Sequence, residues 1–243
     1  MKIDINCDVG EGIVNEHLLM QHISSCNIAC GGHYGDKNTI DKTIQLAIEN
    51  NVLIGAHPSF ADKENFGRKV MHISANDLQT SIQNQLDLFV ERLSKFNKKL
   101  HHIKPHGALY NLIAVDKNAA ENFIKSILKY TENVFLYVPF NSEIEKIALK
   151  NNIKIKYEAF ADRNYNDNLT LVARNKENAI IKNSTQVLNH VCSMALHQKV
   201  TTISNTEIKI KADTFCIHGD HENSLEILAF LSKELAKKGI QIG

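Results

Sequence analysis

The stretch Lys2-Ile-Asp-Ile-Asn-Cys-Asp8-Val-Gly-Glu11-Gly begins as a short strand rich in apolar residues and ends in a cluster of polar side chains. The same arrangement recurs along the chain, and the other clusters are Gly31-Gly-His33-Tyr-Gly-Asp36, Gly55-Ala-His57-Pro58, Lys104-Pro-His106-Gly, Glu158-Ala-Phe-Ala-Asp162-Arg163 and His218-Gly-Asp220. In a parallel barrel of alternating strands and helices the strand ends converge on one face, where such barrels hold their active sites. The repeated pattern therefore predicts an enzyme whose site gathers these clusters.

The predicted strands are short and show little strict alternation, which is typical of strands covered on both faces. They span residues 2–6, 25–30, 52–57, 101–106, 135–139, 153–160 and 212–218. Amphipathic stretches predict helices at residues 36–50, 77–96, 186–197 and 222–238. Strands that alternate with helices pair in parallel through right-handed crossovers, so we expect an α/β barrel.

Two segments interrupt this alternation. Residues 58–74 are long and polar, and a loop of that length usually acts as a lid or a binding loop. Residues 199–211 alternate around Asn205, which predicts a hairpin added at the edge of the fold. Since no repeat or linker divides the 243 residues, we expect one domain over residues 1–243.

Composition excludes several classes of function. A formal net charge of +1, spread along the chain, gives no field that would gather nucleic acid or an anionic membrane. The polar start of the chain is unlike a signal peptide, and no segment approaches 18 apolar residues. We therefore expect a cytosolic protein with no nucleic-acid or membrane partner. The five cysteines form no CxxC pair, which favours buried thiols over disulfides, with a nucleophilic role for Cys7, Cys30 or Cys216 as the alternative.

Arginine is scarce, and two of the four arginines, Arg68 and Arg163, follow strand ends. A guanidinium offers the rigid bidentate fork that binds a carboxylate or a phosphate, whereas a simple surface charge can equally be lysine. Salt bridges to Asp62 or Asp162 are the structural alternative. The sequence leaves both open.

Asp8, His57 and His106 follow the first, third and fourth predicted strands, so a barrel would bring them close to one point. Two imidazoles and a carboxylate on one side of a cavity can hold a divalent metal with open positions for water and substrate. The same residues can equally form a metal-free array, with a histidine as general base and Asp8 fixing its tautomer. Both interpretations stand at this stage.

Other polar residues belong to the same predicted site. His33 and His218 are flanked by glycine at strand ends, so we expect both to line it. Lys104 can stabilise a developing oxyanion or pair with Glu158 or Asp162, and these two carboxylates can divide acid and base roles with those on the first strand. No phosphate-binding P-loop and no dinucleotide fingerprint occurs, so the sequence gives no location for a nucleotide.

Several of these strings resemble the LamB/YcsF family, in the same order from residue 3 to the C-terminus. They are Asp4-Ile-Asn-Cys-Asp-Val-Gly-Glu11, Cys26-Asn-Ile-Ala-Cys-Gly-Gly-His33, Gly55-Ala-His-Pro-Ser59, Phe66-Gly-Arg68, Lys104-Pro-His-Gly-Ala-Leu-Tyr-Asn111, Glu158-Ala-Phe-Ala-Asp-Arg163 and His218-Gly-Asp220. The chain departs from the family pattern at Ala173, where proline is usual, and at His221 and Ser224. Neither place touches the strand-end residues.

The resemblance implies a seven-stranded parallel β/α barrel of the glycoside hydrolase and deacetylase type. Members of the family are described as the A subunit of ATP-dependent 5-oxoprolinase, a hydrolase that opens the lactam of 5-oxo-L-proline to L-glutamate. The B and C subunits of that enzyme are the implied partners, ATP is the co-substrate, and a bound divalent metal is possible. Coupling to ATP makes physical sense, because an unstrained lactam is a poor electrophile until its carbonyl oxygen is phosphorylated.

We therefore expect a catalytic set and a substrate-binding set at the strand ends. The catalytic set is Asp8, His57, Lys104, His106, Glu158 and Asp162, of which Asp8, His57 and His106 are the metal candidates. The substrate-binding set is Asn6, Glu11, His33, Arg68, Tyr110, Arg163, His218 and Asp220. Two alternatives remain: a metal-dependent deacetylase of N-acetylated sugars, and a non-catalytic substrate-binding or regulatory subunit that leaves ATP to a partner or to an unrecognised site.

Overall fold

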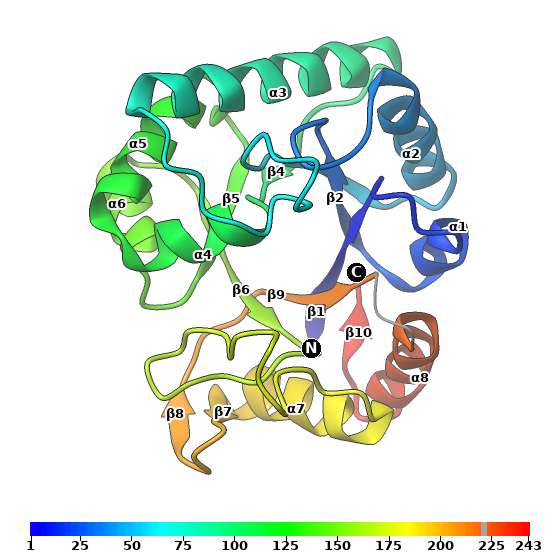
Figure 1. Cartoon of the computed structure of the whole chain (residues 1–243). Helices are drawn as coiled ribbons and strands as arrows, with labels where there is room; N and C mark the ends of the chain where they lie inside the picture. Colours follow the sequence, from blue (N-terminus) through cyan, green and yellow to red (C-terminus); the bar gives the residue numbers. More distant parts are fainter. Residues whose placement is uncertain (220–222) are drawn as a thin grey trace.

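The computed structural model of the chain describes residues 1–219 and 223–243, so Asp220, predicted to bind substrate, lies outside the described residues. Within these ranges seven parallel strands close into a barrel that helices surround (Figure 1). The strands, in order around the barrel, are β1 (Lys2–Val9), β2 (Ser25–Ala29), β3 (Leu53–His57), β4 (His102–Ile103), β5 (Phe135–Pro139), β6 (Ile155–Phe160) and β9 (Thr214–His218). Pairing of β9 with β1 closes the barrel, so the predicted α/β barrel is confirmed.

Helices fill the connections between the strands. They are α1 (Glu16–Leu19), α2 (Lys37–Glu49), α3 (Ala75–Lys95), α4 (Gly107–Val115), α5 (Lys117–Ile127), α6 (Glu143–Lys150), α7 (Ser184–His197) and α8 (Ser224–Lys237), with 3-10 turns η1 (Met20–His22) and η2 (Leu128–Tyr130). The four predicted helices are α2, α3, α7 and α8, and each end lies within two residues of its prediction. Among the described residues no helix combines the length and the apolar character needed to cross a bilayer.

The additional segments lie outside the barrel. Residues 199–211 contain the predicted hairpin, with β7 (Lys199–Thr201) antiparallel to β8 (Glu207–Lys209). The short β10 (Gln241–Ile242) pairs with the start of β1, and the N-terminal ammonium donates to the carbonyl of Gly239, so the two chain ends meet (Figure 1). The long segment between β3 and α3 contains neither helix nor strand, as predicted.

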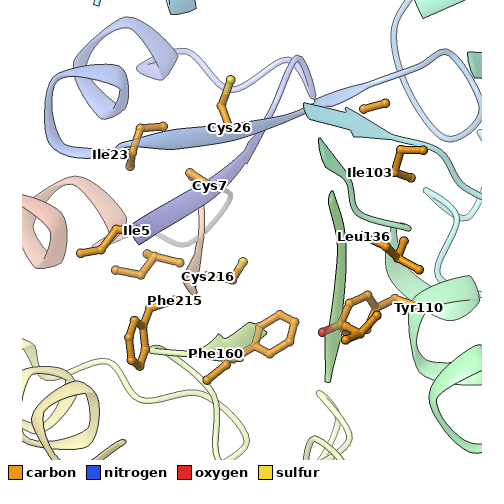
Figure 2. Packing of buried hydrophobic residues seen from close by; sticks show 14 of the residues in the cluster. Ile5, Cys7, Ile23, Cys26, Ile103, Tyr110, Leu136, Phe160, Phe215 and Cys216 are labelled. Atoms are coloured by element: carbon orange, nitrogen blue, oxygen red, sulfur yellow. The ribbon is translucent and has the colours of Figure 1, made fainter. Parts of the chain in front are cut away.

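The barrel interior is polar, whereas its outer surface is apolar. Asp4, Asn6 and Asp8 alternate along β1, and Asn6 and Asp8 both accept from Asn27 across the interior at 2.7 and 2.8 Å. The residues between them, Ile5 and Cys7, point to the other face of the strand and are fully buried in the apolar core (Figure 2). Burial of side chains of this size stabilises a fold by ~1.5–3 kcal/mol each.

A histidine occupies the centre of this polar interior. His102 is fully buried, stacks on Tyr137 at 4.0 Å between ring centroids, and hydrogen bonds through Nε2 to Oδ1 of Asn27 at 2.7 Å. This bond turns the Asn27 amide so that its nitrogen faces Asp8. Gly55 on β3 makes room for the ring, because a Cβ at this position would lie 2.1 Å from Nε2 of His102.

We predict that Gly55→Ala lowers the free energy of unfolding by ~1–3 kcal/mol, because the added methyl overpacks the interior against His102. In a His102→Ala background the added methyl meets open space, so the same substitution should lower the free energy of unfolding much less. Chemical denaturation of the two single variants and the double variant measures this coupling. Equal costs in both backgrounds would contradict the packing described.

Candidate functional site

A cavity of about 330 Å³ opens at the carboxyl ends of the strands, and we call it cavity 1. The predicted site residues that line it are Asp8, Glu11, His57, Arg68, Lys104, His106, Tyr110, Arg163 and His218. Four others lie behind this lining and bond to it, namely Asn6, His33, Glu158 and Asp162. The barrel thus brings together residues that are as far apart in sequence as Asp8 and His218, which face each other in register on β1 and β9.

The tautomers of two histidines follow from their backbone partners. Nδ1 of His57 donates to the carbonyl of Lys104 at 2.7 Å, and Nε2 of His106 donates to the carbonyl of Phe66 at 2.9 Å. A carbonyl can only accept, so both protons are committed there and each neutral ring presents a lone pair on its other nitrogen. Those nitrogens, Nε2 of His57 and Nδ1 of His106, face each other at 2.9 Å. Two lone pairs this close require a proton or a metal cation between them.

Carboxylates add further acceptors around the same point. Oδ2 of Asp8 lies 3.3 Å from Nε2 of His57, and Oε1 of Glu11 lies 3.4 Å from Nδ1 of His106 and 3.9 Å from Nε2 of His57. A tetrahedral site with ligand bonds of about 2.0–2.2 Å has edges of about 3.3–3.6 Å. The separations of 3.3 and 3.4 Å match such edges, whereas those of 2.9 and 3.9 Å lie on either side of them. Glu11, His57 and His106 belong to one group of ligand atoms that all lie within 4.8 Å of one another, and Asp8 adjoins it through His57, so the cluster can hold a metal.

His33 backs this donor set. Its ring stacks on that of His106 at 3.7 Å, and its Nε2 lies 2.8 Å from Oε1 of Glu11. Burial, with the neighbouring His57, lowers the pKa of His33 to about 3, so the ring is neutral and Nε2 carries the donated proton. Burial and the neighbouring histidines hold the pKa of His106 well below its ordinary value. Neutral rings are the form that ligates metals.

Lys104 is completely buried at the centre of the site, where it binds two carboxylates. Its Nζ lies 2.9 Å from Oδ1 of Asp8, 3.0 Å from Oε1 of Glu158 and 2.9 Å from Sγ of Cys216. Burial alone would lower the pKa of Lys104, but these partners raise it well above its ordinary value. Burial likewise opposes ionisation of Asp8, and His57 with Lys104 outweighs it and lowers the pKa of Asp8 well below the usual range.

Asp162 and His218 form a separate pair on the opposite wall. One Asp162 oxygen accepts from the backbone N–H of His218 at 3.0 Å, and the carboxylate also accepts from Nδ1 of the same histidine at 3.0 Å. This bond fixes the tautomer in which Nε2 is the acceptor. Burial on its own would raise the pKa of Asp162, but His218 outweighs it, so this pKa lies below its ordinary value and the carboxyl stays ionised.

Three of the four arginines line cavity 1, and they are Arg68, Arg163 and Arg174. Arg163 directs its hydrogen bonds to the backbone: Nε donates to the carbonyl of Ala179 at 3.2 Å and Nη2 to that of Val172 at 2.5 Å. It therefore braces the loop after β6 while adding positive charge to the cavity. Arg68 lies over the ring of Phe66, with 4.9 Å from its guanidinium carbon to the ring centroid.

Several residues of the site were not predicted. Asn27 and His102 carry hydrogen bonds to Asp8 through the barrel interior, and Arg174 and Asn111 line the cavity. Asn27 could have been predicted to belong to the site, because it is an isolated polar residue inside an apolar strand. The scarcity of arginine was the signal for Arg174.

We predict that Lys104→Met lowers the free energy of unfolding at pH 7 by ~3–5 kcal/mol, since it leaves Asp8 and Glu158 buried without a counter-charge. The matched control is Lys129→Met: Lys129 is a half-exposed surface lysine paired with Asp87, and its loss should leave the free energy of unfolding close to that of the wild type.

The loss of unfolding free energy in Lys104→Met should be largest at neutral pH and smaller at acidic pH. The depressed pKa of Asp8 means that its stabilising contribution is complete above the unfolded value of ~4 and is lost as pH falls through the folded value. Denaturation of wild type and Lys104→Met should therefore differ most near pH 7, and the gap should narrow as pH approaches 3. A gap that stays constant on acidification would refute the ion-pair assignment.

Comparison with known proteins adds the following. A profile of the LamB/YcsF family matches residues 3–243. A protein of Campylobacter jejuni subsp. doylei named as the A subunit of 5-oxoprolinase is 39% identical over 99% of this chain and 96% of its own length. A Pyrococcus abyssi protein of the same name is 36% identical over 100% of this chain and 97% of its own.

Solved structures agree with these relatives. The lactam utilization protein from Thermus thermophilus superposes with a TM-score of 0.92 at 29% identity, over 100% of this chain and 99% of that one. A family 4 carbohydrate esterase from Streptomyces lividans gives a TM-score of 0.50 at 10% identity, over 100% of this chain and 91% of that one, which is a likeness of fold alone. The chain belongs to the LamB/YcsF family.

Proposed function

We propose that this chain is the A subunit of an ATP-dependent 5-oxoprolinase and that cavity 1 is where the lactam of 5-oxo-L-proline is opened to L-glutamate. The near full-length relatives named for the same 5-oxoprolinase subunit support the reaction. The observation that carries the site is the convergence of four acceptor atoms, from Asp8, Glu11, His57 and His106, beside a cavity that also contains arginines.

The charge distribution of cavity 1 suits an anionic cyclic amide. Arg68 and Arg174 offer guanidinium groups for the ring carboxylate, and for a phosphoryl group if the lactam arrives phosphorylated, while Arg163 adds positive charge to the cavity. The three N–H bonds of Lys104 already have three acceptors within 3.0 Å, so we assign Lys104 to holding Asp8 and Glu158 in place. The oxyanion that develops at the reacting carbonyl then depends on the arginines and on whatever cation the histidines bind.

Two groups of the chain can move the protons that lactam opening requires. His218, oriented through Nδ1 by Asp162, has Nε2 as an acceptor at the cavity wall and can remove a proton from the attacking water. His57 and His106 hold their lone pairs toward one point and can bind a divalent cation, which would polarise a carbonyl and acidify a water. Asp8 and Glu11 supply the negative charge that keeps such a cation bound.

ATP is the phosphoryl donor in this scheme, and it binds either to the partner subunits or to a site of this chain that is not a P-loop. Transfer of the γ-phosphoryl group to the lactam oxygen turns the amide carbon into a reactive imidate. Water then adds to that carbon, the C–N bond breaks with protonation of the nitrogen, and an acyl phosphate remains. A second water hydrolyses it to L-glutamate and phosphate, so the sum is one ATP and two waters for each ring opened.

We predict that His57→Ala and His106→Ala each lower ATP-dependent glutamate release by ~10²–10⁴-fold in the complex reconstituted with the B and C subunits. The matched control is His22→Ala, since this histidine lies in η1, outside the described site, and should retain wild-type turnover. Thermal melts would first show that the wild type and the three variants are folded. Near-normal turnover of both His57→Ala and His106→Ala would then refute the site. Full activity with Asp8→Asn as well would mean that the chain is non-catalytic.

Asp162→Asn tests the proton-transfer pair separately. The backbone N–H and Nδ1 of His218 both lie 3.0 Å from Oδ2 of Asp162, and Nδ1 also lies 3.1 Å from Oδ1. The amide replaces one of these oxygens by a nitrogen and removes the negative charge that stabilises the ring when it takes up a proton. We expect kcat to fall at least ~10²-fold while KM for 5-oxoproline changes little. An unchanged kcat would remove His218 from the reaction.

The acceptor cluster also favours a second candidate, a metal-dependent deacetylase that acts without ATP. The discriminating assay incubates the purified chain and a divalent metal with N-acetylglucosamine oligomers. Acetate release without ATP and without partners would support the deacetylase. Release of glutamate from 5-oxoproline only with ATP and both partners supports the proposal made here.

A further inference from the structure

A second cavity of about 400 Å³ adjoins cavity 1, and neither alternative above uses it. We call it cavity 2. Residues common to the lining of both cavities are Tyr110, Asn111, Phe160, Leu171 and Ala173. Its own walls come from the ends of β5 and β6, from α4 and from the loop after β6, and most of them are apolar. Cavities 1 and 2 together therefore offer more space than a single five-membered ring requires.

Two polar atoms in this apolar cavity lack any hydrogen-bond partner among the described residues. They are Oε2 of Glu158 and the hydroxyl of Tyr110, and both side chains line cavity 2. Glu158 is 2% exposed and Tyr110 is 5% exposed. Figure 2 shows the Tyr110 ring reaching from its helix toward Phe160, and the two rings meet edge to face at 5.6 Å. Leaving a buried polar group unpaired costs about 1–3 kcal/mol, so a ligand that pairs with both atoms would recover that cost.

The charge at Glu158 specifies what such a ligand carries. Among the described residues Lys104 is the cation bonded to both Asp8 and Glu158, so these three groups together hold one excess negative charge. Oε1 of Glu158 accepts from Lys104 and from Asn6 at 3.0 Å each, which leaves Oε2 without a partner within hydrogen-bond distance among the described residues. Burial and the same carboxylate raise the pKa of Tyr110 well above its ordinary value, so the hydroxyl stays neutral beside it. An acceptor with net negative charge selects a cationic donor over a neutral one.

The walls of cavity 2 match a cation on an apolar body. Aromatic side chains contribute much of the lining, namely Tyr110, Phe140, Phe160 and Tyr165. Ring faces attract ammonium groups, most strongly where water is excluded. The hydroxyl of Tyr165 already accepts from the backbone N–H of Phe160 at 2.7 Å, so Tyr110 supplies the hydroxyl that remains for a ligand.

We propose that cavity 2 binds a primary ammonium group, with Oε2 of Glu158 and the hydroxyl oxygen of Tyr110 as its acceptors. This site stands on its own geometry. The identity of the bound ammonium group rests on the proposed function. Lactam opening releases the ring nitrogen as the ammonium group of L-glutamate. This group would then bind to Glu158, while the carboxylates of L-glutamate stay with the arginines of cavity 1.

Calorimetric titration of the purified chain with cyclopentylammonium and with cyclopentanol tests the ammonium site, because both probes have the same ring and only one is charged. We expect the ammonium probe to bind about ten-fold more tightly, and Tyr110→Phe and Glu158→Gln to remove most of that preference. Tyr130→Phe is the control, since it deletes a hydroxyl that bonds to Asp87 on the surface. Equal binding of the two probes, or a preference that survives both substitutions, would overturn the site.

Folding of the key variant gives an independent readout. The Tyr110 hydroxyl lies close to the Glu158 carboxylate, which contributes to its raised pKa, but has no partner within hydrogen-bond distance among the described residues. Tyr110→Phe should therefore leave the thermal midpoint close to that of the wild type while it weakens ammonium binding. A lowered midpoint would mean that this hydroxyl is structural, which would overturn its assignment as a ligand acceptor.

A second titration separates the site from its link to the reaction. L-glutamate should bind about ten-fold more tightly than glutarate, which lacks only the ammonium group, and Tyr110→Phe should reduce that difference. If cyclopentylammonium binds as expected and the two dicarboxylates bind equally, the ammonium site stands and its identification with the lactam nitrogen fails. The glutamate-release assay decides the proposed function independently of both results.

Discussion

Lys104, the residue directly after β4, joins the end of that strand to three other strands of the barrel. Its ammonium group, fully buried, bonds to Asp8 on β1, to Glu158 on β6 and to Cys216 on β9. A charge in such a place is stable only while its counter-charges remain, because removing it from water costs several kcal/mol. The backbone carbonyl of the same residue fixes the tautomer of His57. One residue therefore sets both the electrostatics of the interior and the direction of a key lone pair.

The chemistry available at the barrel mouth follows from this interaction. Asp8 uses one oxygen for Lys104 and turns the other toward His57, and Glu158 uses one oxygen for Lys104 and contributes to the lining of cavity 2. The two carboxylates thus face different cavities although they share one cation. Arg68, Arg163 and Arg174 line cavity 1 together with Asp8 and Glu11, so that cavity contains both positive and negative groups.

Sequence reasoning recovered the barrel because its signals are local. Short apolar runs that end in polar clusters survive as strands and strand ends, and convergence of Asp8, His57 and His106 then follows from parallel order. The same reasoning missed α1, α4, α5 and α6. Helix α4 shows no amphipathic pattern, because it is packed between neighbours and is apolar on nearly all sides. Helix α5 was missed even though its buried residues Ala120, Phe123, Ile124 and Ile127 follow a helical spacing.

Most pairings across the interior were out of reach of the sequence. Nothing in the chain says that Asn27 bonds to Asp8 or that Arg163 holds backbone carbonyls, because each depends on the register of strands distant in sequence. The pairing of Lys104 with Glu158 was one of the predicted alternatives, whereas its second partner, Asp8, was not predicted. The tautomers of His57 and His106 were equally hidden, since they depend on the carbonyls of Lys104 and Phe66.

The most direct test of this account is nitrogen NMR of the histidine rings, with and without added Zn²⁺. The structure requires a proton on Nδ1 of His57 and on Nε2 of His106 in the neutral rings, with the two remaining nitrogens shifting together when the metal binds. The opposite tautomer on either ring, or resonances that ignore the metal, would contradict the convergence of lone pairs on which the proposed site depends.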